Sequence, residues 1–193
     1  MSNSQLRLLV YLMAFGIGTA RAQQNVPPPP KPADSGPSLA DTMNFIQDKL
    51  NDLKVTYMSY GHDNVAGTDF TNKFTDEYTK VVADPGACQI RYHYKDLRDG
   101  GVTVDTDPWF NLKAVANIVV MSREQALKQI DSAAGHPEYS YKIDPPMFVL
   151  HVVRTDKALH DFTFPEEDLA NRVAKAMVHA VELCGGGSKP EPF

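Results

Sequence analysis

The side chains that could do chemistry in this sequence are six histidines, a scatter of carboxylates and two cysteines. The histidines occupy positions 62, 93, 136, 151, 160 and 179. No two of them stand four apart on a predicted helix or two apart on a predicted strand, the spacings that place metal ligands on one face. The sequence therefore predicts neither a metal site nor a cofactor.

Aromatic and acidic residues gather near one predicted hairpin. Asp105 and Asp107 directly precede Trp109 and Phe110, and His93 lies on the preceding strand. An aromatic pair beside carboxylates can hold a ligand or a sugar ring, so these five residues are the candidate ligand-binding residues. The two aromatic residues could equally anchor the core. A calcium site needs about six to eight oxygen ligands, and the calcium-loop pattern is absent, which favours a solvated acidic edge.

A histidine paired with a carboxylate could instead act as the general base of a small hydrolase. The candidate pairs combine His62 or His93 with Asp96 or Asp105. The adjacent His62 and Asp63 are better explained as part of a turn. No Gly-x-Ser-x-Gly nucleophile motif occurs in the sequence. We therefore expect no catalytic residue and favour a non-enzymatic binding or interaction module of unknown ligand, with the hydrolase as the alternative.

The two cysteines, Cys88 and Cys184, leave no odd thiol. In an oxidising compartment such a pair usually forms a disulfide. A redox centre would more often show Cys-x-x-Cys, and a zinc site would need further ligands. We predict a structural disulfide that braces the last helix against the sheet.

The N-terminus predicts export. Arg7 precedes the apolar run 8–15, and Ala20-Arg21-Ala22 has the small-x-small form of a cleavage site, so residues 1–22 are interpreted as a signal peptide. Cleavage would leave 17 basic and 24 acidic residues, a net charge of −7. Such a chain repels nucleic acid, and it has no second apolar run long enough for a membrane span. We expect a soluble, secreted or periplasmic protein that binds another protein or a small ligand.

The rest of the chain divides by composition. Residues 23–37 contain four consecutive prolines, Pro27 to Pro30, and are predicted to be a disordered proline-rich linker. Residues 38–185 have the length of one domain, and residues 186–193 are predicted to be a flexible tail. The glycines at 185–187 follow a helix and are interpreted as its stop, because a phosphate-binding loop would precede one.

Apolar periodicity predicts an N-terminal helix, seven strands and a closing helix. A short helix beginning at Ser122, with Ala126, Leu127 and Ile130 inward, interrupts the strands. The strand at 115–121 is nearly all apolar and is expected to be buried on both faces, and Gly61 to Asn64 is expected to be a turn. The helices are predicted at 39–53 and 165–183, and the strands at 55–60, 68–82, 88–95, 102–104, 115–121, 147–153 and 159–164.

This order predicts a small antiparallel α+β domain. Seven strands followed by a C-terminal helix, over residues 55–184, resembles the pleckstrin-homology-like (PH-like) architecture, which implies two near-orthogonal sheets in a partly open barrel capped by the helix. A curved sheet around the first helix, as in cystatin-like folds, is the alternative.

Three stretches also resemble a family of uncharacterised exported bacterial proteins. They are Asp84-Pro85-x-x-Cys88, residues 110–121 from Phe110-x-Leu112 to Ile118-Val119-Val120-Met121, and residues 170–186 from Ala170-Asn171-Arg172 to Cys184-Gly185-Gly186. The resemblance implies export and this fold, and it implies no activity.

Overall fold

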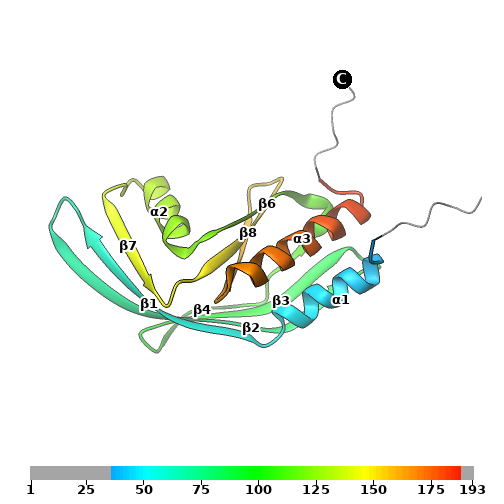
Figure 1. The fold of residues 1–193 in the computed structure, drawn as a ribbon, viewed down its shortest axis with the longest axis horizontal. Coiled ribbons are helices and arrows are strands. Elements are labelled where there is room, and N and C mark those ends of the chain that lie inside the picture. Colours follow the sequence, from blue (N-terminus) through cyan, green and yellow to red (C-terminus); the bar gives the residue numbers. More distant parts are fainter. Residues whose placement is uncertain (1–35, 188–193) are drawn as a thin grey trace, which may run out of the picture. The chain divides into compact units, whose positions relative to one another are not determined.

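The structure, a computed structural model, describes residues 36–187. These residues form three α-helices, a short 3-10 helix and nine strands in two antiparallel sheets (Figure 1). The predicted signal peptide, most of the predicted linker and the end of the predicted tail lie outside the described residues. None of the helices within residues 36–187 is long and apolar enough to cross a membrane.

The larger sheet is built around a four-stranded meander, and its strand order is β4-β3-β2-β1-β7, with β5 paired to β3. The turn between β3 and β4 uses Asp99 and Gly100, both at positive φ, as the Asp-Gly-Gly sequence predicts. The strands are β1 (Leu53–Asp63), β2 (Thr68–Asp84), β3 (Gln89–Arg98), β4 (Gly101–Thr106), β5 (Trp109–Asn111) and β7 (Tyr139–Asp144).

The smaller sheet has the order β6-β8-β9. Its strands are β6 (Val115–Ser122), β8 (Phe148–Arg154) and β9 (Leu159–Phe164). The 3-10 helix η1 (Leu112–Ala114) leads into β6, and α2 (Arg123–Ala134) leaves it. Ser122 caps α2 through the full capping box with Gln125, as the sequence predicts.

Helices α1 (Leu39–Leu50) and α3 (Glu167–Leu183) lie side by side (Figure 1). Their apolar faces share one core with both sheets, and the predicted spacing of buried positions is confirmed at Met43, Ile46, Val173 and Met177. A second, smaller cluster surrounds Tyr57 of β1 and includes residues of β2, β7 and α2. The protein is therefore α+β and antiparallel, as expected.

Several element predictions are wrong in detail. There are nine strands rather than seven, because the sequence predicts no strand at β5 or β7, and the sheets form no closed barrel among the described residues. Residues 61–63 continue β1, so the turn begins three residues later than predicted, at Asn64. Ile130 of α2 is exposed rather than inward. Polar residues such as His62 alternate with buried residues in a long strand, so the end of the strand can be mistaken for a turn.

The largest correction concerns β6. Its apolar sequence predicted burial on both faces, yet it is an edge strand whose one neighbouring strand within residues 36–187 is β8. Ala116, Asn117 and Val119 are exposed. Helix α3 covers part of one face, and a helix can shield apolar strand residues as well as a second strand can.

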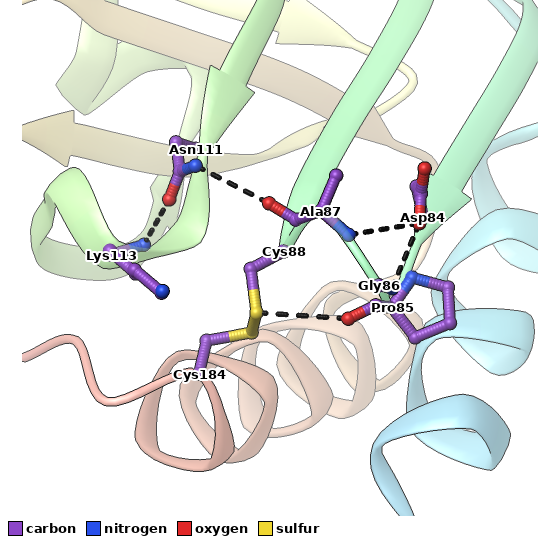
Figure 2. The surroundings of a disulfide bond; sticks show 8 residues. All are labelled: Asp84, Pro85, Gly86, Ala87, Cys88, Asn111, Lys113 and Cys184. Carbon is purple, nitrogen blue, oxygen red and sulfur yellow. Dashed lines mark hydrogen bonds between the residues drawn. A yellow bond between two sulfur atoms is a disulfide. The ribbon is translucent and has the colours of Figure 1, made fainter.

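The predicted disulfide joins Cys88, just before β3, to Cys184, just after α3 (Figure 2). The two Cα atoms are 5.9 Å apart. Asp84 fixes the turn that presents Cys88, because its Oδ1 accepts hydrogen bonds from the backbone N–H groups of Gly86 and Ala87. The bridge therefore ties the end of α3 to the start of a central strand.

We expect reduction of this bridge to destabilise the fold without abolishing it. The cysteines are 96 residues apart, and bridges of this kind commonly contribute about 2–4 kcal/mol, which corresponds to a fall of roughly 5–15 °C in the melting temperature. Calorimetry with and without dithiothreitol measures this fall. The doubly substituted Cys88→Ala, Cys184→Ala protein is the control, because dithiothreitol should leave its melting temperature unchanged. An oxidised protein that shows two free thiols would contradict the assignment.

Candidate functional site

The structure brings four of the five predicted ligand-binding residues together. His93 lies in the middle of β3, Asp105 near the end of β4, Asp107 in the link between β4 and β5, and Trp109 at the start of β5, where it is 53% exposed. Phe110 is fully buried and packs against the ring of His160, with ring centroids 4.6 Å apart. Each interpretation of the aromatic pair therefore applies to one of the two residues: Trp109 faces outward, and Phe110 anchors the core.

His93 is held by two carboxylates. Its Nδ1 lies 2.9 Å from Asp107 Oδ1, and its Nε2 lies 3.4 Å from Asp105 Oδ1. A general base needs one ring nitrogen directed at the nucleophile. Since both nitrogens of His93 face carboxylates, this residue is arranged to position Asp107 rather than to take a proton from a substrate.

Beside this cluster is a shallow depression of about 300 Å³. Its rim is formed by Trp109 of β5, by Arg91 and His93 of β3, and by Lys80 of β2. Arg91 and Trp109 are direct cross-strand partners. Lys80 sits where the β2–β3 register shifts, with φ 52°, so a bulge turns its side chain toward the depression.

The other predicted histidine, His62, does not pair with Asp63. Its Nδ1 lies 2.7 Å from Oδ1 of Asp69, its cross-strand partner on β2. On the opposite side its partner is Ser140 of β7, so Asp69, His62 and Ser140 form one row across three strands. Asp63 instead accepts hydrogen bonds from the backbone N–H groups of Ala66 and Val65, which lower its pKa.

That row is open to solvent. It borders a depression of about 460 Å³, and the Asp69 side chain is 87% exposed. No hydrogen bond joins Ser140 to His62 within residues 36–187. His136 with Glu138 and His151 with Asp161 are further histidine–carboxylate pairs. Among the residues that the structure describes, no group of three or more His, Cys, Asp or Glu side chains is placed to hold a metal ion.

A groove that sequence reasoning missed runs between β6 and α3. It consists of two adjoining depressions, of about 510 Å³ and about 340 Å³, which share Ile118, Val178 and Glu182. Figure 1 shows β6 and α3 beside one another. The walls are mostly apolar, and the polar residues among them are Asn117, Asn171, Lys175, His179 and Glu182.

One end of the groove is fixed by the glycines after α3. The N–H of Gly186 donates to the carbonyl of Val181, and a Cβ at Gly186 would lie only 2.7 Å from the carbonyl oxygen of Leu112. This position therefore requires glycine for close packing. Gly186, which the sequence assigned to the tail, helps to hold the end of α3 beside η1.

The outer backbone groups of β6 can be assigned from three hydrogen bonds. Ile118 N–H donates to Asn117 Oδ1 and Ser122 N–H donates to Gln125 Oε1, whereas Arg123 N–H donates to the carbonyl of Met147, next to β8. Successive residues of a strand direct their backbone groups to opposite edges. The N–H and C=O groups of Val120 therefore point to the free edge.

A buried polar cluster joins the two hydrophobic clusters. Asp76 of β2 is 1% exposed and accepts hydrogen bonds from Tyr94 Oη at 3.1 Å and Tyr57 Oη at 3.5 Å. The Arg123 guanidinium lies over the Tyr57 ring, 5.7 Å from its centroid. Burial raises the pKa of Asp76, although Arg123 opposes the shift; Asp96, directly opposite on β3, adds to it. Burial also raises the pKa values of Tyr57 and Tyr94.

This cluster positions elements rather than binding a substrate, because Asp76 is closed to solvent. It fixes the start of α2, where Arg123 stands, against the middle of β2. A signal for it exists in the sequence: Asp76 alternates with Phe74 and Tyr78, so it falls on the apolar face of its strand.

Comparisons with known proteins give no match: no family model, no curated protein and no solved structure matches this chain. The resemblance to exported bacterial proteins stays a prediction. Function is therefore inferred from the geometry of the chain's own residues.

The buried Asp76 gives a pH dependence of known sign. Because its pKa is raised in the folded protein, its stabilising protonated form is kept at low pH, and stability is lost as the pH rises through that raised pKa. We expect the free energy of unfolding of the wild type to fall relative to Asp76→Asn as pH increases. Denaturant titrations between about pH 4 and pH 8 measure the difference. The exposed Asp48→Asn is the matched control, and a pH-independent difference for Asp76→Asn would contradict the assignment.

Proposed function

We propose that this protein is an exported, non-enzymatic interaction module that binds an extended segment of a partner protein along the free edge of β6, beside α3. The observation that carries the proposal is the groove between Ile118 on β6 and Val178 on α3. An extended chain would add to the smaller sheet as a fourth strand, and its alternate side chains would enter the groove.

The composition of the edge supports this proposal. Exposed strand edges are normally protected by charged residues or proline, because they otherwise pair with other chains. The edge strands β4, β7 and β9 carry Asp105, Lys142 and Asp161 respectively, whereas β6 has no charged residue over its eight positions. An uncharged apolar edge is what a strand-binding surface needs.

The groove also indicates the chemistry of the segment. Ile118, Val120, Val178 and Val181 offer apolar contacts on both sides, so inward-pointing residues of the partner should be apolar. The backbone groups at Val120 offer one donor and one acceptor to any extended chain. We therefore expect a segment with apolar residues at alternating positions and little dependence on its other side chains.

The PH-like architecture and the export are part of the same proposal. A meander of β1 to β4, a second sheet of three strands and a closing helix support the PH-like arrangement, although β7 adds to the first sheet. The disulfide is compatible with an oxidising compartment, which supports a secreted or periplasmic location.

The groove is tested with peptides selected from a random library on the oxidised protein. We expect selected peptides to carry alternating apolar residues and to shift the amide NMR signals of β6 and α3. Val178→Asp should weaken binding at least about tenfold, since a charge would enter the apolar wall. Binding is measured by isothermal titration calorimetry.

Val102→Asp is the matched control, because Val102 is similarly exposed but lies on β4, away from the groove. Signal shifts confined to other elements would overturn the proposal. Concentration-dependent dimerisation abolished by Val178→Asp would make a second copy of this chain the occupant and would also overturn it.

The alternative is a small hydrolase. The observation that favours it is the row of Asp69, His62 and Ser140, which has the residue types and the order of a nucleophile–base–carboxylate set. The His62–Asp69 contact leaves Nε2 of His62 free to face Ser140. The exposure of this row to water, and the lack of a hydrogen bond between its serine and histidine within the described residues, favour the binding module instead.

We expect no hydrolysis of p-nitrophenyl esters that depends on His62. Buffered rates with the wild type, His62→Ala and Ser140→Ala should be equal, and His93→Ala should match them because both ring nitrogens of His93 face carboxylates. Turnover that disappears in His62→Ala and in Ser140→Ala, but persists in His136→Ala, would establish the hydrolase in place of the non-enzymatic module.

A further inference from the structure

The depression around Trp109 has features that the β6 groove does not use. Trp109 presents its side chain from the three-residue strand β5 on the outer face of the larger sheet. An exposed tryptophan face offers a flat apolar platform next to polar groups. Stacking of a ring on this platform would remove apolar surface from water on both partners.

The platform is flanked by cations. Arg91 is the direct cross-strand partner of Trp109, and the bulge in β2 directs Lys80 to the same depression. Within residues 36–187, neither Lys80 nor Arg91 takes part in an ion pair. Their charges are thus available to a ligand, and an arginine fork matches a carboxylate with two parallel hydrogen bonds.

The carboxylates at the site are already oriented. Asp107 and Asp105 both contact His93, and within residues 36–187 neither forms an ion pair with Lys80 or Arg91. The Asp107 side chain is 82% exposed, and its second oxygen is open to accept hydrogen bonds from a ligand. The site therefore combines an apolar platform, two cations without an ion-pair partner among the described residues, and an acceptor within one depression of about 300 Å³, which is enough for a single ring.

We propose that this depression is a second binding site, which takes an acidic saccharide: a sugar ring stacks on Trp109, its carboxylate binds Arg91 and Lys80, and a hydroxyl donates to Asp107. A purely aromatic ligand would make no use of Asp107, and a neutral sugar would leave both cations unpaired. The site is independent of the proposed peptide groove, because none of its residues lines that groove.

Trp109 is the only tryptophan in the sequence, so intrinsic fluorescence reports on this site alone. We expect a short oligogalacturonate to change the emission in a saturable manner. Its methyl-esterified form keeps the rings but loses the charge, and it should bind at least about tenfold more weakly. Short poly-glutamate keeps the charge without the rings and should also bind at least about tenfold more weakly.

Variants assign the contacts. Arg91→Gln and Lys80→Gln should each weaken oligogalacturonate binding several-fold, while Lys73→Gln, an exposed lysine elsewhere on β2, should leave it unchanged. Trp109→Ala removes the fluorophore, so its binding is measured by calorimetry, and we expect this variant to lose binding. Circular dichroism checks that each variant is folded, and Trp109→Phe keeps a platform if the alanine variant is unstable.

Three results would overturn the proposal. Equal affinity for the charged and methyl-esterified sugars would remove the role of the cations, and equal affinity for poly-glutamate would leave only general attraction to anions. The absence of any fluorescence or calorimetric response to oligogalacturonate would remove the site. None of these outcomes affects the peptide groove, whose test uses Val178→Asp.

Discussion

The bond between Cys88 and Cys184 is the constraint on which the arrangement of the C-terminal helix depends. It joins residues 96 apart in the sequence and pins the end of α3 to the start of β3 (Figure 2). Val178 and Val181, one to two turns before Cys184, form a wall of the β6 groove, and Gly186 closes its end. The bridge thus fixes the distance between α3 and β6 as well as the stability of the domain. An oxidising location would keep the disulfide formed and so preserve both this distance and the stability of the domain.

The sequence predicts elements that one residue pattern defines locally, and it fails where the environment decides. Ser122 begins a helix as the sequence predicts, through hydrogen bonds within a few residues, and Ser38 and Gly135 mark helix ends in the same local way. The predicted burial of both faces of β6 is wrong, because an apolar run looks the same in a strand covered on one face as in one covered on both. The strand predicted at 68–82 is confirmed as β2, since β propensity and the following turn outweigh the helix-like four-residue spacing of Phe70, Phe74 and Tyr78.

The same distinction applies to the candidate sites. Asp105, Asp107 and Trp109 are close in the sequence, so their association with His93 could be predicted. Arg91 and Lys80 reach the same depression through strand register and a bulge, neither of which has a signature in a single sequence. The row of Asp69, His62 and Ser140 likewise depends on the pairing of β7 with β1, a contact across about 80 residues of chain.

The outer face of the larger sheet and the free edge of β6 differ in the groups that they present to solvent. On the outer face of the larger sheet, charges alternate from strand to strand, as in the row of Lys54, Glu77, Lys95 and Asp105, and such a face stays soluble without a cover. The edge of β6 carries no charged residue: the outward backbone groups of Val120 stand beside apolar side chains, and water satisfies the backbone groups but not the side chains. Charged residues on this strand would reduce its pairing with other chains. Under the proposed function, an extended chain would satisfy the backbone groups and cover the apolar wall at the same time, which an uncharged edge permits.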